Sequence, residues 1–183
     1  MKHYISILRG INVSGQKKII MKDLKALYEN AGFKDVVTYI QSGNVLFNAD
    51  ESLSEKEIIK LIEEAIFTTY QFHVPIIIRT INELETVVAE NPYLTEESDI
   101  ERLYVSFLAE DPSEQALENL KKYDFPPEKY AVYGRTVYIS CPNGYGNTKL
   151  SNNFFESKLK VSATTRNWKT TNKLIEISKT SFQ

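Results

Sequence analysis

A five-residue segment occurs twice in this chain of 183 residues and constrains the fold more than any single motif. Residues 4–8 are Tyr-Ile-Ser-Ile-Leu, and residues 104–108 are Tyr-Val-Ser-Phe-Leu. Both have the apolar, β-branched and aromatic composition of a strand. The same order of elements follows each copy: a helix, a hairpin, a second helix and a strand. Units of the form β-α-β-β-α-β fold as ferredoxin-like, split βαβ domains.

The predicted fold class is therefore α+β, with two ferredoxin-like (split βαβ) subdomains. Each would have an antiparallel or mixed sheet with helices packed on one face. Asn91-Pro92 and the acidic run at 96–99 have the composition of a linker. We therefore expect one subdomain at 1–95 and the other at 96–183. The alternative is a chance similarity between two amphipathic strands.

Composition excludes several classes of protein and site. Hydrophobic residues make up 42% and charged residues 25%, as in globular proteins. Cys141 is the only cysteine, so it cannot form an intramolecular disulfide, and with His3 and His73 it cannot form a usual Cys/His zinc site. We predict no metal site, and no cofactor is indicated.

The chain contains no apolar run as long as a membrane-spanning helix. It begins directly with a strand-like segment rather than with a signal peptide. We therefore expect a cytoplasmic protein that does not contact membranes.

The formal net charge of -2 hides an uneven distribution along the chain. The first 25 residues hold six basic residues and one acid, and the stretch 83–118 holds eleven acids and one arginine. From residue 149 onward there are seven basic residues and two acids. These could be solvated faces of opposite sign. The alternative is that the two basic ends meet around one anionic ligand.

The loop at residues 9–18 follows the first predicted strand and precedes a helical pattern that begins near Met21. Arg9 can form a bidentate pair with a carboxylate or phosphate, and Gly10 allows a close backbone approach. Asn12 adds an amide, and Lys18 adds charge near a helix start, where anions are favoured. No Gly-Lys-Ser/Thr follows, so the loop is not a P-loop. Alternatively, Arg9 pairs with a neighbouring acid and the glycines only serve the turn.

The segment Gln41-Ser42-Gly43-Asn44 lies between two predicted strands. Its residue types are typical of a hairpin turn. The alternative is that the Gln41 and Asn44 amides face the same ligand as the loop at 9–18. That requires the turn and the end of the first strand to lie at the same edge of the sheet.

Two polar segments near the C-terminus complete the candidate site. The Gly-rich loop at 142–148 precedes Lys149 and a helix predicted near 150–158. Lys149 could hold an anion at the start of this helix. The alternative is an ordinary connecting loop without a ligand. A short strand is predicted near 160–163 and a last helix near 167–178. Arg166 lies beside the start of that helix, where Thr165 or Asn167 could act as a cap.

These segments together resemble a bacterial family of unknown function. Its motifs LLRGIN, YIQSGNV and TTRNW correspond here to residues 7–12, 39–45 and 164–168. One departure is Ser14, where the family usually has glycine. The resemblance implies a duplicated ferredoxin-like arrangement. It implies no activity, and no catalytic residue can be carried over from it.

The leading hypothesis is a protein that binds a small anionic, phosphate-containing ligand. The candidate ligand-binding residues are Arg9, Gly10, Asn12, Lys18, Gln41, Asn44, Lys149, Arg166 and Asn167. One alternative is an RNA-binding module, because ferredoxin-like sheets can present aromatic side chains to bases. Another is an oligomerisation or protein-interaction domain. The residues identify no catalytic acid, base or nucleophile, so whether the protein is an enzyme stays open, as does its oligomeric state.

Overall fold

The computed structural model describes residues 1–182. Its contacts divide the chain into two units. The first unit comprises Met1–Leu84 and the residues from Leu174 onward, and the second comprises Glu85–Lys173. The predicted subdomain boundary between residues 95 and 96 stays a prediction.

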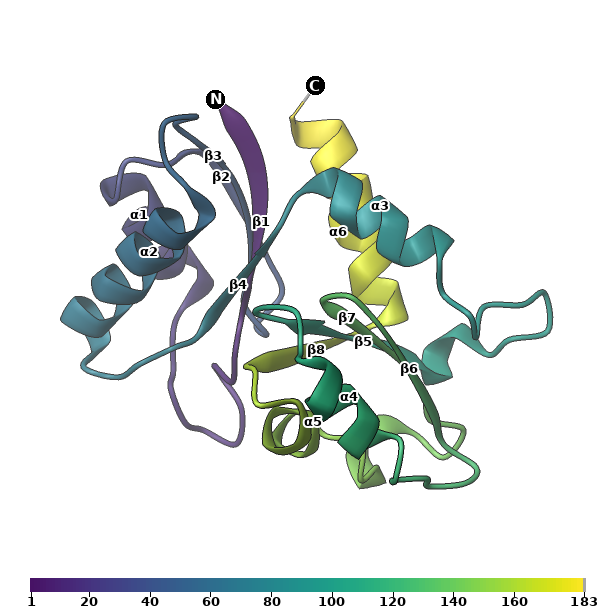
Figure 1. Ribbon diagram of the computed structural model, residues 1–183. Helices are drawn as coiled ribbons and strands as arrows, with labels where there is room; N and C mark the ends of the chain where they lie inside the picture. Colours follow the sequence, from purple (N-terminus) through teal and green to yellow (C-terminus); the bar gives the residue numbers. More distant parts are fainter. Residues whose placement is uncertain (183) are drawn as a thin grey trace. The chain divides into compact units, whose positions relative to one another are not determined.

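The first unit has the order of elements that the sequence predicts. Its elements are β1 (Lys2–Leu8), α1 (Met21–Asn30), β2 (Lys34–Tyr39), β3 (Asn44–Ala49), α2 (Glu55–Tyr70), β4 (Ile76–Arg79) and the start of α3 (Ile81–Ala89). The sheet order is β2-β3-β1-β4, and all its pairs are antiparallel. This is the ferredoxin-like arrangement, and Figure 1 shows α1 and α2 on one side of the sheet.

Alternation along β1 separates the two faces of this sheet. Tyr4 and Leu8 join Phe47 in the core beneath the helices, whereas Ile5 and Ile7 point to the other face. Between Tyr4 and Leu8, the Ser6 hydroxyl forms a 2.8 Å hydrogen bond with the buried Tyr28 hydroxyl of α1. The core of the first unit therefore contains one satisfied polar pair.

The second unit repeats the first. Its elements are the 3₁₀ helix η1 (Ile100–Arg102), β5 (Leu103–Leu108), α4 (Glu114–Leu120), β6 (Lys129–Tyr133), β7 (Thr136–Ser140), the 3₁₀ helix η2 (Tyr145–Asn147), α5 (Asn152–Leu159), β8 (Ala163–Asn167) and the start of α6 (Trp168–Ser181). The sheet order is β6-β7-β5-β8, again antiparallel. The fold class predicted from the sequence is confirmed.

The repeated segment occupies the same place in both sheets. Ser6 of β1 lies opposite Val45 and Ile78, and Ser106 of β5 lies opposite Val137 and Thr165. In each sheet the repeated strand thus pairs with the last strand of the hairpin and with the last strand of the unit. The two copies of the segment are equivalent in structure, not only in sequence.

The strand predicted near 160–163 is wrong in position. Helix α5 ends at Leu159, its C-cap residue Lys160 adopts a left-handed conformation with φ of 63°, and β8 begins at Ala163. The β-branched Thr164 and Thr165 belong to the strand, whereas the sequence interpretation ended the strand before them and named Thr165 as a possible helix cap. Among the described residues 1–182, no helix has both the length and the apolarity needed to cross a membrane.

Candidate functional site

The loop from β1 to α1 and the hairpin turn between β2 and β3 lie at one end of the first unit's sheet. Strand β1 runs antiparallel to β3, with Ile7 opposite Asn44. The Leu8 N–H then donates to the Gly43 carbonyl at 2.9 Å. The structure thus brings the segment that begins at Arg9 next to the turn that holds Gln41.

The tip of the loop is a small hairpin. The Gln16 N–H donates to the Val13 carbonyl at 3.0 Å, and the Asn12 N–H donates to the Lys17 carbonyl at 3.2 Å. Ser14 and Gly15 occupy the centre of this turn with φ of 51° and 75°, as in a type I′ turn. The turn requires a left-handed residue at position 14, which explains why glycine suits this position better than serine.

Asn12 holds the loop in shape. Its Nδ2 donates to the carbonyls of Ile19 and Gln41, both at 2.9 Å, and its Oδ1 accepts from the Ile19 N–H at 2.9 Å. One side chain therefore closes the loop and ties it to the β2–β3 turn. The structure gives Asn12 a positioning role, and its predicted contact with a ligand stays a prediction.

The β2–β3 turn is packed directly against the loop. Gly43 is buried with φ of 79°, and a Cβ placed on it would lie 2.6 Å from Ile11 Cδ1. The buried Asn44 donates from Nδ2 to the Tyr39 carbonyl at 3.0 Å and to Ser42 Oγ at 3.2 Å. Gln41 is exposed beside it. The sequence interpretation missed the packing role of Gly43, because it depends on a contact with another segment.

The basic residues of the loop differ in their surroundings. The half-buried Arg9 donates its backbone N–H to the Pro75 carbonyl at 3.0 Å. Lys17 Nζ donates to the His73 carbonyl at 2.6 Å, which anchors the loop to the segment before β4. Lys18 is exposed and directly precedes Ile19, the residue held by Asn12. Gly10 follows Arg9 with φ of 69°.

Helix α1 begins without a capping side chain. Its N-cap residue is Ile20, which makes no side-chain hydrogen bond to the first turn. Within residues 1–182, every other α-helix is capped, by Ser54, Thr80, Ser113, Ser151 and Asn167. The first-turn N–H groups of α1 therefore keep their partial positive charge, offset in part by Asp23. An isoleucine before a helix start is visible in the sequence, but the sequence interpretation did not use it.

The remaining candidates belong to the second unit. Lys149 is exposed, and its Nζ lies 5.6 Å from the centroid of the Phe125 ring. Arg166 on β8 is only 7% exposed and donates from Nη1 to Thr164 Oγ1 at 3.1 Å and to the Thr165 carbonyl at 2.9 Å. Burial lowers the pKa of the Arg166 guanidinium to about 10.

The structure does not place Lys149 and Arg166 in one site. Ala163 of β8 packs in the core cluster that includes Phe125, and alternation turns Arg166 to the opposite face. Lys149 and Arg166 thus lie on opposite faces of the sheet. Asn167 Oδ1 accepts from the Thr170 N–H at 2.7 Å and caps α6, as the sequence predicts. No group of three or more His, Cys, Asp or Glu side chains in the described part of the chain could hold a metal ion.

Comparison with known proteins identifies the family. The model of a family described as protein of unknown function (DUF1697) matches residues 1–138. The chain belongs to the DUF1697 family. The family resemblance predicted from the sequence is confirmed. A comparison with curated proteins finds no match.

A solved structure extends the comparison to the whole DUF1697 chain. The conserved bacterial protein SP0830 from Streptococcus pneumoniae matches with a TM-score of 0.73 and 23% identity, over 98% of this chain and 99% of that one. At this identity the likeness shows the fold alone. The DUF1697 match includes the loop at 9–20 and the turn beside it, whereas Lys149, Arg166 and Asn167 lie beyond the matched residues.

Proposed function

We propose that this protein binds a small, phosphate-containing anion at the N-terminal end of α1. The observation that carries the proposal is the uncapped start of this helix, reached through a loop with three basic residues and no acid. Backbone N–H groups at a helix N-terminus bind phosphate well because they combine donors with a favourable dipole.

The conformation of the loop supports the proposal. Gly10, Asn12, Ser14, Gly15 and Lys17 all have positive φ. Three of these residues have side chains, so the loop holds backbone conformations that cost free energy. Such strain is common in segments that bind ligands. The hydrogen bonds of Asn12 and Lys17 keep the loop in this conformation without a ligand.

The residues have distinct roles in the proposed site. Lys18 supplies an exposed charge, Arg9 supplies a guanidinium that can form two parallel hydrogen bonds, and Gln41 supplies an exposed amide. Gly10, Asn12 and Asn44 shape the loop and the turn. The predicted roles of Lys149, Arg166 and Asn167 stay predictions that their geometry does not support. A cytoplasmic location belongs to the same proposal.

Thermal unfolding at constant ionic strength tests the site. Inorganic phosphate, a sugar phosphate and a nucleotide should each be compared with chloride. We expect at least one phosphate compound to raise Tm, and Arg9→Ala with Lys18→Ala to weaken its binding about tenfold or more, because charged hydrogen bonds contribute about 1.5–3 kcal/mol each. Lys34→Ala, an exposed lysine on β2, is the matched control. No stabilisation beyond chloride, or an equal effect of the control, would contradict the proposal.

The RNA-binding alternative gains no support from the first unit. The sheet face away from α1 and α2 carries the aliphatic residues Ile5, Ile7 and Ile77 at the positions where base stacking would require aromatic rings.

A further inference from the structure

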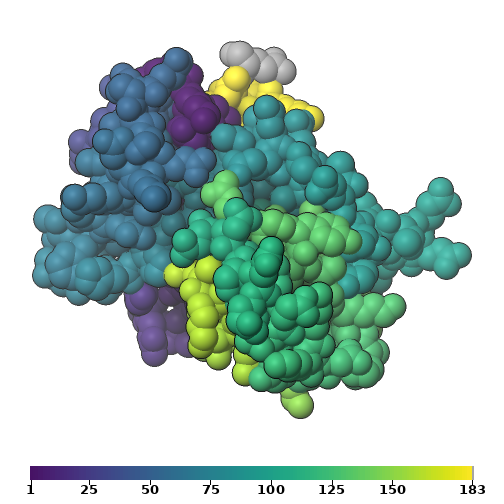
Figure 2. All heavy atoms as spheres, in the orientation of Figure 1, coloured from purple at the N-terminus to yellow at the C-terminus, as the bar shows by residue number. Residues whose placement is uncertain are grey.

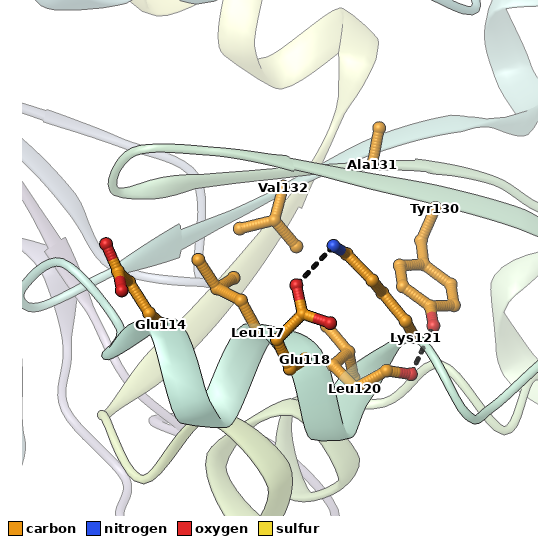
Figure 3. A pocket seen from close by; sticks show the side chains of 8 residues that line it. All are labelled: Glu114, Leu117, Glu118, Leu120, Lys121, Tyr130, Ala131 and Val132. Atoms are coloured by element: carbon orange, nitrogen blue, oxygen red, sulfur yellow. Dashed lines mark hydrogen bonds and ion pairs between the residues drawn. The ribbon is translucent and has the colours of Figure 1, made fainter.

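A pocket in the second unit lies between α4 and the strand β6, and no function above accounts for it. Its volume is about 540 Å³, and its lining comprises Glu114, Leu117, Glu118, Leu120, Lys121, Tyr130, Ala131 and Val132. Figure 3 shows the side chains of Leu117 and Val132 pointing toward each other across the pocket, with Glu114 at one end. Figure 2 shows the surface around α4 on the visible face of the molecule.

One wall of the pocket is the edge of a sheet. Strand β6 is first in the order β6-β7-β5-β8, and within residues 1–182 it pairs with β7 alone. A two-residue turn, Gly134-Arg135, joins the two strands, with Gly134 at φ of 52°. Such a turn makes its flanking residues, Tyr133 and Thr136, a hydrogen-bonded pair.

This register decides which backbone groups point outward. Hydrogen-bonded and non-bonded pairs alternate along an antiparallel ladder, so the N–H and C=O groups of Tyr130 and Val132 face away from β7. The side chains of these same two residues line the pocket. An added strand would therefore find backbone donors and acceptors beside an apolar floor.

The opposite wall is acidic near the hairpin. Glu114 lies in the first turn of α4, and Asp111 lies just before the helix. A Cβ on Gly134 would lie 3.5 Å from Asp111 Oδ1, which places this carboxylate at the hairpin end of the groove. Glu118, farther along, forms an ion pair with Lys121. Asp111 and Glu114 thus place negative charge at the hairpin end of the groove.

We propose that β6 accepts an extended, basic segment of another protein as an additional strand. A lysine or arginine of that segment would face Asp111 and Glu114, and a branched aliphatic side chain would pack on Leu117 and Val132. β6 has five residues, so a segment of about five residues would cover it. Backbone hydrogen bonds would supply affinity, and the basic side chain would supply selectivity.

A second copy of this chain fits the groove less well. On β6, Tyr130 and Val132 face the groove, whereas Lys129 and Ala131 point to the other face of the sheet. Figure 3 shows Ala131 turned away from the pocket. A partner's β6 would therefore bring no cation to the acidic end, and charge complementarity favours a basic segment of a different protein.

Fluorescence anisotropy with two labelled peptides tests this proposal. One seven-residue probe has arginine and valine in turn at its odd positions and threonine at its even positions, so that arginine and valine lie on the same face of the strand, and the other has glutamate in place of each arginine. We expect the arginine peptide to bind at least about tenfold more tightly, because like charges at a docking surface oppose binding. Val132→Pro should weaken it about tenfold or more, since proline removes an outward donor and leaves the bonds to β7.

Charge variants separate binding from folding. Glu114→Lys should weaken binding of the arginine peptide about tenfold, with Glu97→Lys, an exposed acid outside the groove, as the matched control. Far-UV circular dichroism should show both variants folded. Equal binding of the two peptides, or unchanged binding by both groove variants, would overturn the proposal. Self-association that Val132→Pro abolishes would overturn it in favour of a second copy as the occupant.

Discussion

The connection from β1 to α1 and the connection from β5 to α4 occupy the same place in the two repeats. The first has twelve residues, 9–20, with three basic residues and no acid. The second has five residues, 109–113, with two acids and no basic residue. The first leads to an uncapped helix and the second to a helix capped by Ser113. The two repeats thus have the same strand order, but the connections that follow their first strands carry opposite charge.

The cores differ at an equivalent residue as well. The Ser6 hydroxyl bonds to Tyr28, whereas the Ser106 hydroxyl is buried without a hydrogen-bond partner in the described structure. A buried hydroxyl without a partner costs free energy. The first unit therefore gains stability from a serine at this position, and the second loses some.

The largest expected difference between the repeats concerns their hairpin turns. Gly43→Ala should lower the free energy of unfolding by about 4 kcal/mol, because it adds overpacking against Ile11 to the cost of a left-handed alanine. Gly134→Ala has only an ordinary contact with Asp111 and should cost about 1–2 kcal/mol. Urea unfolding measures both, and equal losses would refute the packing role of Gly43.

The second-largest difference in stability is expected between substitutions of the two equivalent serines, Ser6 and Ser106. Ser6→Ala should destabilise the protein by about 2 kcal/mol, because it leaves the buried Tyr28 hydroxyl without its partner. Ser106→Ala should be neutral or slightly stabilising, because it removes a hydroxyl that has no partner. Urea midpoints of the two variants test this, and a loss at Ser106 as large as at Ser6 would contradict it.

Substituting one serine in each connection should change the stability of the protein in opposite directions. Ser14→Gly should stabilise by about 1 kcal/mol, since glycine adopts the φ of 51° at this turn without the cost that serine incurs. Ser113→Ala should destabilise by about 1 kcal/mol, since it removes the bond from the Ala116 N–H that caps α4. Differential scanning calorimetry would show Tm moving in opposite directions, and two shifts of the same sign would contradict the comparison.

The smallest effect concerns pH. Burial lowers the pKa of His3 below its ordinary value of 6.5, although the Phe47 carbonyl partly opposes the shift. The unfolded chain then binds more protons, so this contribution to stability is present above about pH 6.5 and is lost as the pH falls through that value. Leu103 is the equivalent residue in the second unit, so His3→Leu should flatten stability between about pH 7 and 5. An unchanged pH profile by urea unfolding would exclude His3 as its source.

Much of the fold followed from local patterns. The repeated segment predicted the duplication, and the local patterns Ser54–Glu57 and Thr80–Glu83 form capping boxes at the starts of α2 and α3. Local composition was insufficient for β8, because a threonine suits both a strand and a helix cap, and Thr165, a possible cap of the last helix by sequence, lies in the strand.

The candidate site was less predictable because it depends on contacts between distant segments. The register of β1 with β3 places the turn at 40–43 beside the loop, and no local pattern determines that register. The roles of Asn12 and Gly43 rest on contacts with Gln41 and Ile11. Alternation along β8 likewise separates Arg166 from Lys149.

An NMR titration with inorganic phosphate tests the central claim most directly. In ¹H–¹⁵N spectra at constant ionic strength, we expect saturable shifts of the amides at residues 18–23 and no comparable shifts at 110–116, the equivalent end of the second unit. Arg9→Ala with Lys18→Ala should weaken the response. Absence of saturable shifts at 18–23, or equal shifts at both ends, would contradict an anion site specific to the first repeat.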